Sequence, residues 1–232
     1  MVYFNKDLLP VDEINPMWKS LNTAERMYLR ENAKYEEFKR GSIIYREGAA
    51  PTHMYCLISG KVKIFRDFVG GRSQLVRIIG PGESFAYRAY FAGENFMTSA
   101  AAVDNSEAYS LPLTVVGQIL KSNNSLAVEF IKLLSRDLGV MDIRVVSLTQ
   151  KHVRGRLAET LVMLMDKYGT EEDGKTLWGG MPREDLASFS NMTISNAIRT
   201  LSNFASEGII ELDGRRIRVL DEEKLRRISQ LG

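Results

Sequence analysis

The strongest constraint on the fold is a change of pattern at Leu111-Pro112. Before it, from about Gly41, short runs of β-branched and aromatic residues are separated by glycines at close intervals. Strands of this kind are typical of a compact antiparallel barrel or roll, and Gly70-Gly71 predicts a hairpin turn between two of them. After Leu111-Pro112 the spacing becomes helical, and a strand pattern returns only near residues 209–219. The chain is therefore predicted to be an α+β protein whose main sheet region comes first.

One helix is expected before the strand region, over residues 17–37, and two are expected after it, over residues 113–121 and 125–150. The last contains no proline, and its apolar residues follow a 4-3 spacing over about three heptads. Such an a/d seam is narrower than the stripe that a globular helix usually buries, so pairing with a second copy is favoured over packing on the chain's own strands. The spacing begins at Ala127, and the residues expected in the dimer interface are Ile131, Leu134, Leu138, Met141, Val145 and Leu148.

Composition excludes several classes of protein. The chain has 232 residues with 44% hydrophobic and 26% charged residues, which are ordinary values for a folded domain. Its one cysteine, Cys56, excludes an internal disulfide and a four-cysteine metal site. The N-terminus lacks the apolar core of a signal peptide, and no run reaches the length of a membrane span. A cytoplasmic protein without metal, cofactor or membrane partner is expected.

The C-terminal third has the pattern of a winged helix-turn-helix. A helix over about 153–168 precedes the acidic segment 170–175, and another begins at Pro182. Thr193 is a natural N-cap for the next helix, which runs to about Ser206. Its apolar residues share one face, and short polar side chains with one arginine share the other, namely Ser195, Asn196, Arg199, Ser202 and Asn203. This arrangement is typical of a helix that reads the major groove.

A basic hairpin follows this helix. Asp213-Gly214 lies between two alternating runs and predicts a tight turn. The hairpin carries Arg215, Arg216 and Arg218. A basic wing beside a recognition helix is suited to phosphate contacts next to base contacts. Double-stranded DNA is therefore the expected partner of this module.

The whole chain resembles the Crp/Fnr family of bacterial transcription regulators. The matching segments are 41–48, 53–55, 59–63, 80–83 and 153–158, and the likeness continues into the helix-turn-helix. It implies a β-roll sensor over 1–124, a dimerisation helix over 125–151 and a winged helix-turn-helix over 152–232. The implied partners are a palindromic DNA site, a second copy of the chain, RNA polymerase and a small-molecule effector. With the residue pattern, it gives as DNA-contact candidates Arg183, Thr193, Ile194, Ser195, Asn196, Arg199, Arg215 and Arg216.

The family's cyclic-nucleotide cassette is altered in this chain. Where cyclic-AMP binders have Gly-Glu and then Arg followed by Ser or Thr, the chain has Ala86-Tyr87 and Phe96-Met97. Phe96 offers no charge to a phosphate, and Tyr87 is no carboxylate, so weak or no binding of cyclic AMP is predicted. The aromatic residues either line a site for an apolar ligand or fill it themselves. The effector-pocket candidates are Ala86, Tyr87, Arg88, Phe96, Met97, Met141 and Asp142.

The predicted function is that of a homodimeric, sequence-specific DNA-binding regulator that responds to an effector other than cyclic AMP. The alternative is a small-molecule-binding signalling module that acts through protein partners. An enzyme is not expected, because the chain has only two histidines and lacks catalytic pairings or a phosphate loop. His53 and Cys56 are interpreted as structural residues, His152 as a hinge or interface residue, and Arg88 as solvated or ion-paired.

Overall fold

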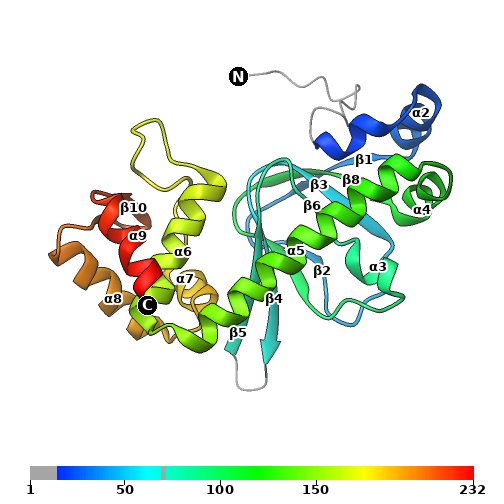
Figure 1. The fold of residues 1–232 in the computed structure, drawn as a ribbon. Helices are drawn as coiled ribbons and strands as arrows, with labels where there is room; N and C mark the ends of the chain where they lie inside the picture. The colour runs from blue at the N-terminus through cyan, green and yellow to red at the C-terminus, as the bar shows by residue number, and fades with distance from the viewer. Residues whose placement is uncertain (1–14, 69–71) are drawn as a thin grey trace. The chain divides into compact units, whose positions relative to one another are not determined.

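The computed structural model describes residues 15–68 and 72–232, which form two compact units (Figure 1). The first unit holds the described residues up to Arg72 together with Val76–Asp137, and the second holds Ser73–Leu75 and Leu138–Gly232. The boundary falls within one helix, α5 (Asn124–Gln150), which contributes residues to both units. The turn predicted at Gly70-Gly71 lies outside the described residues.

Two four-stranded sheets form the β region, and the paired strands given a register run antiparallel, as predicted. The first sheet has the order β1 (Lys34–Phe38), β8 (Ser106–Pro112), β3 (His53–Ser59), β6 (Ser84–Phe85). The second has the order β2 (Ile43–Tyr45), β7 (Ser99–Ala102), β4 (Val62–Phe68), β5 (Arg72–Ile79). Strand β8 lies between β1 and β3, so the last strand of the region joins its first strand to the centre of the sheet.

The single helix predicted over 17–37 is wrong. A 3-10 helix, η1 (Pro16–Ser20), is followed by α2 (Thr23–Asn32) and then by strand β1. Asn22 starts α2 with a reciprocal cap, since its side chain accepts from the Glu25 amide while the Glu25 carboxylate accepts from the Asn22 amide. Residues 34–38 pair with β8 along their whole length, and this tertiary pairing outweighs the local helical pattern.

One cluster of core residues in the first unit lies between the first sheet and its helices. Trp18, Leu29, Met54 and Leu111 are buried there together with the apolar side of α4 (Leu113–Ser122) and the first turns of α5. Phe130 of α5 contacts Trp18 edge to face, with ring centroids 6.1 Å apart. A short helix, α3 (Arg88–Ala92), follows β6. The sheet and the start of α5 therefore share one core.

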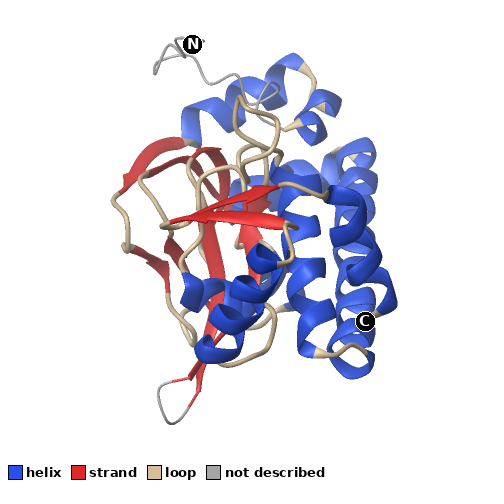
Figure 2. Cartoon of the chain, turned by 90° about the vertical axis from the view of Figure 1, so that its left-hand side faces the viewer, coloured by secondary structure: helices blue, strands red, loops and turns tan. Residues whose placement is uncertain are grey.

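The second unit is largely helical and carries a two-stranded hairpin. Figure 2 shows the helices of the chain in blue and its strands in red. The elements of the second unit after α5 are α6 (Val153–Tyr168), α7 (Arg183–Phe189), α8 (Ile194–Ser206), β9 (Ile210–Asp213), β10 (Arg216–Val219) and α9 (Glu222–Leu231). Leu157, Leu201 and Phe204 are buried at its centre. The α+β class with an antiparallel sheet region, a long helix and a C-terminal helix-turn-helix is confirmed.

Among the helices that the structure describes, none combines the length and apolar character needed to cross a membrane.

Candidate nucleic-acid interface and sensor pocket

Helix α8 has one buried face and one free face. Ala197, Leu201 and Phe204 are buried on the inner side. Thr193 is the N-cap, as predicted, and its hydroxyl accepts from the Asn196 amide at 3.2 Å. The opposite face is exposed and consists of Ile194, Ser195, Ile198, Arg199, Ser202 and Asn203. An open face of this length is available to enter a major groove.

Arg199 is exposed on this face and is oriented by a neighbour one turn away. Its Nη2 donates to the Asn196 side-chain oxygen at 2.9 Å. Asn196 is half-buried, so it is placed to hold the guanidinium rather than to extend beyond it. Arg199 keeps donors that suit the two acceptors on the major-groove edge of guanine.

Arg156 of α6 holds the turn between α7 and α8, a role that the sequence does not reveal. Its guanidinium donates to the carbonyls of Lys151 at 2.9 Å, Ser190 at 3.0 Å and Asn191 at 3.0 Å. Asn191 adopts a left-handed φ of 49°, which turns the chain towards α8. In the sequence, Arg156 is visible only as a basic residue on an amphipathic helix. Two of the carbonyls that it contacts lie more than thirty residues away, and the third lies just before the start of α6.

The three wing arginines differ in their partners. Arg215 is exposed and has no ion pair or side-chain hydrogen bond among the described residues. Arg216 forms an ion pair with Glu171, and Arg218 lies 3.6 Å from Asp173 and 3.4 Å from Glu211. Arg215 is therefore the wing arginine that is open to a phosphate.

The acidic segment 170–175 is the source of two of these partners. Asp173 also closes its own turn, because its carboxylate accepts from the hydroxyl and amide of Thr176 and from the amide of Lys175. The Thr176 hydroxyl, followed by these amides, lowers the pKa of Asp173 to about 2. The sequence showed an acidic surface loop, but the contact with the wing depends on tertiary structure.

Arg183 contacts the wing turn. Its Nη2 donates to the Gly214 carbonyl at 2.7 Å, and burial lowers its pKa. The side chain is half-buried at the start of α7. This position suits a residue that holds the hairpin against α7, and direct contact with DNA stays a prediction for Arg183.

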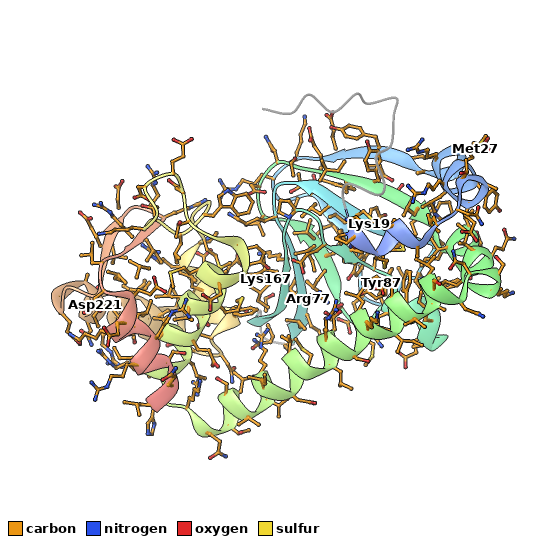
Figure 3. The ribbon with its side chains drawn as sticks, turned by 45° about the horizontal axis from the view of Figure 1, so that its top comes forward. Lys19, Met27, Arg77, Tyr87, Lys167 and Asp221 are labelled. Atoms are coloured by element: carbon orange, nitrogen blue, oxygen red, sulfur yellow. The ribbon has the colours of Figure 1, made fainter. Side chains whose placement is uncertain are left out.

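The altered cassette brings Tyr87 against the long helix. Tyr87 is 3% exposed, and its hydroxyl donates to Asp137 Oδ2 at 3.1 Å. Arg77 Nη1 donates to the same oxygen at 2.5 Å, and Arg77 Nη2 lies 3.5 Å from Glu83 Oε1, so strand β5 and helix α5 share one polar cluster. Arg77 and Tyr87 are labelled in Figure 3. Burial, followed by the nearby Asp137 charge, raises the pKa of Tyr87, which keeps it a neutral donor. The preceding Ala86 has a left-handed φ of 69°.

Phe96 is buried by stacking. Its ring lies on that of Tyr45 with centroids 3.9 Å apart, and burial raises the pKa of Tyr45 to about 12. Arg88 pairs with Glu94 at 3.2 Å, in line with the expectation of an ion-paired arginine. Met97 is exposed, as is Phe91. The segment that resembles the family's cyclic-nucleotide cassette therefore contains an aromatic ring packed on Tyr45.

The remaining pocket candidates lie further along α5, in the second unit. Met141 is half-buried and Asp142 is exposed.

The cysteine and the two histidines lie in other elements. Cys56 is buried in β3 beside the Ser84 hydroxyl at 3.3 Å, and burial raises the pKa of its thiol. His53 Nδ1 lies 3.0 Å from the Thr52 hydroxyl, and His152 is the N-cap of α6.

Helix α5 exposes an apolar face. Ile131, Leu138 and Val145 recur every seven residues and are 62%, 63% and 61% exposed. The alternate seam residues Leu134, Met141 and Leu148 are half-buried, and Leu134 packs on the core of the first unit. Further exposed apolar residues of the helix are Val128, Val140, Ile143 and Val146. Exposed apolar surface of this extent is typical of an interface.

Comparison with known proteins identifies both parts of the chain. The cyclic nucleotide-binding domain family matches residues 35–123, and the Crp-like helix-turn-helix domain family matches residues 155–228. The chain is 28% identical to a CRP-like cAMP-activated global transcriptional regulator of Mycobacterium tuberculosis over 82% of its length and 86% of the relative. It is 27% identical to the nitrogen fixation regulation protein FixK of Azorhizobium caulinodans over 83% and 77% of the two chains.

Solved structures agree on the fold. FixK2 from Bradyrhizobium japonicum superimposes with a TM-score of 0.78 at 18% identity, covering 84% of this chain and 96% of that one. A CRP/FNR family transcriptional regulator from Thermus thermophilus gives 0.71 at 24% identity, with 85% and 98% covered. Fold and matched domains define a transcriptional regulator in which a cyclic nucleotide-binding-like domain precedes a helix-turn-helix. Within this class, the chain belongs to the Crp/Fnr family.

Proposed function

We propose that the protein binds a specific DNA sequence as a homodimer and regulates transcription in response to an effector other than cyclic AMP. The observation that carries the DNA-binding part is the free face of α8 with Arg199 on it, next to a wing whose Arg215 is open. A guanidinium on a groove-reading helix distinguishes bases, and a wing arginine adds phosphate attraction that is independent of sequence.

The homodimer is supported by the exposed seam of α5. Three large aliphatic side chains at heptad spacing stay in water in the single chain, and pairing with a second α5 would cover them. A two-fold dimer presents two recognition helices about 34 Å apart, one turn of DNA, which requires a palindromic site. The functional division we propose is a sensor over 1–124, a dimerisation helix over 125–151 and a DNA-binding module over 152–232.

The proposal that the effector is not cyclic AMP rests on the packed cassette. The Mycobacterium tuberculosis relative is described as cAMP-activated. In this chain, Phe96 is stacked on Tyr45, and Tyr87 donates to Asp137. Neither side chain can replace a charge-assisted contact to a cyclic phosphate. The pocket candidates are therefore proposed to fill the site in large part, and any effector must displace or bypass these contacts.

The proposed protein partner is RNA polymerase, and the proposed location is the cytoplasm of a bacterial cell. Both proposals are based on the relatives, which are bacterial transcription regulators. The test of the proposed function is selection of binding sites from random duplexes by the full-length chain. The proposal predicts enrichment of a palindrome that contains a fixed guanine in each half-site. Recovery of unenriched DNA would favour the alternative, a signalling module that acts through protein partners.

A further inference from the structure

Two isoleucines project from the free face of α8. Ile194 is 46% exposed and Ile198 is 49% exposed, although the buried face of the same helix already supplies its packing through Ala197, Leu201 and Phe204. They are four residues apart and therefore lie on successive turns of one side. The hydrophobic core makes no use of these two side chains.

Their surroundings leave them prominent on this face. Ser195 and Ser202 are short, and the Asn196 side-chain oxygen accepts a hydrogen bond from Arg199. Ile194 is the first residue of α8, and the N-terminal residues of a recognition helix are the ones that contact base edges. Arg199 directly follows Ile198, so the two side chains leave the helix about 100° apart around its axis.

The major groove offers an apolar group of one kind, the C5 methyl of thymine. We propose that Ile194 and Ile198 read thymine methyls in the half-site, beside the guanine read by Arg199. Four residues of helix rise about 6 Å, which corresponds to a separation on the order of two base steps. The inference rests on the proposed DNA binding and adds the chemistry by which the half-site is chosen.

The experiment removes methyl groups from the DNA one at a time. A duplex enriched from random DNA is rebuilt with single deoxyuridine-for-thymidine replacements, which delete the methyl and keep every hydrogen-bonding group. Fluorescence anisotropy titrations of the full-length protein then give the affinity for each duplex. Loss of one buried methyl should weaken wild-type binding roughly fourfold at two thymines of the half-site.

The protein variants assign each methyl to a side chain. In Ile198→Ala, the penalty for removing the methyl that Ile198 contacts should disappear, while the penalty at the other thymine remains. Ile194→Ala should show the reverse. Ser206→Ala is the matched control, because it alters an exposed residue at the C-terminal end of the same helix, outside the face assigned to DNA, and should retain both penalties. All three positions are exposed, so thermal melting should show the folded state unchanged.

The outcomes separate this inference from the proposed function. Deoxyuridine without effect throughout the half-site, or penalties that persist in both alanine variants, would overturn the reading of methyls. If Arg199→Ala still loses specificity in that case, DNA binding stands and only the role of the isoleucines fails. If the chain enriches no sequence at all, the proposed function itself is contradicted.

Discussion

Arg199 and Arg215 present their guanidinium groups differently from Arg156, Arg183 and Arg216 of the second unit. Arg156 and Arg183 donate to backbone carbonyls, and Arg216 is paired with Glu171. Arg199 is oriented by Asn196 but remains on an open face, and Arg215 is open on the wing. The contacts of each guanidinium group therefore separate the arginines that hold backbone segments in place from the one proposed to read a base and the one proposed to attract phosphate.

Substituting these arginines should have distinct effects on binding. Arg199→Ala should cost about 1–3 kcal/mol on the selected site and little on random DNA, because a bidentate base contact supplies discrimination. Arg215→Ala should weaken both DNAs and lower the salt slope by about one unit. Arg216→Ala should have a smaller effect, because Glu171 already neutralises that group. Titrations at two salt concentrations measure all three, and equal losses on both DNAs for Arg199→Ala would refute its role as a base reader.

At the scale of the element, capping and pairing decide where segments begin and end. The long helix α5 and the two helices of the helix-turn-helix follow from spacing, from the absence of proline and from the Thr193 cap. The region 17–37 could not be divided correctly from its own pattern, since β1 exists through its pairing with β8. The contacts of Arg156 and Glu171 were likewise invisible, because their partners lie far away in sequence.

The turn between β3 and β4 depends on Gly60. Its φ is +81°, and a Cβ there would lie 2.5 Å from the Asn105 carbonyl oxygen and 2.7 Å from the Ser106 Cα. Gly60→Ala should therefore lower the free energy of unfolding by about 2–4 kcal/mol, from backbone strain and overpacking together. Gly41→Ala is the control, since its φ is +82° and its Cβ would meet nothing within 4 Å. Chemical denaturation should show a loss of about 1 kcal/mol there, and equal losses would contradict the packing argument.

If the apolar seam of α5 forms the dimer interface, a charged residue introduced into the seam should prevent dimerisation. Leu138→Glu should make the protein a monomer, because an unpaired carboxylate in an apolar interface costs several kcal/mol, of order 3 or more. Lys121→Glu places the same charge on the exposed end of α4 and should leave assembly unchanged. Light scattering at micromolar concentration distinguishes the two, and a monomeric wild-type protein would contradict the interface.

At the scale of the whole molecule, two domains of known type account for most of the chain. Their order and the long helix could be predicted from the sequence, because the strand pattern ends at Leu111-Pro112 and a 4-3 apolar spacing follows it. For the altered cassette the sequence left two alternatives, a site for an apolar ligand or a site filled by its own side chains. The contacts of Phe96 with Tyr45 and of Tyr87 with Asp137, fifty residues further on, could not be predicted because they depend on tertiary structure.

The proposed filling of the cassette by Phe96 and Tyr87 predicts that cyclic nucleotides bind poorly. Loss of a charge-assisted phosphate contact from a closed site costs about 2–5 kcal/mol, so the affinity for cyclic AMP should fall by roughly 10²-fold or more relative to a cassette with its arginine. Isothermal titration calorimetry with cyclic AMP and cyclic GMP checks this expectation. Binding at micromolar concentration or tighter would refute it and would require the Tyr45–Phe96 stack to open.

Two copies of the chain are proposed to bind two half-sites on one face of DNA, and the spacing of the half-sites tests this arrangement. The palindrome enriched by selection is compared with versions that carry five or ten additional base pairs at its centre. Five pairs rotate one half-site by about half a turn, and ten pairs restore the face at a greater distance. The five-pair insertion should reduce the affinity to that of a single half-site, because the two recognition helices can then no longer enter both half-sites. Equal affinity for the original and the five-pair duplex would contradict a two-fold dimer on DNA.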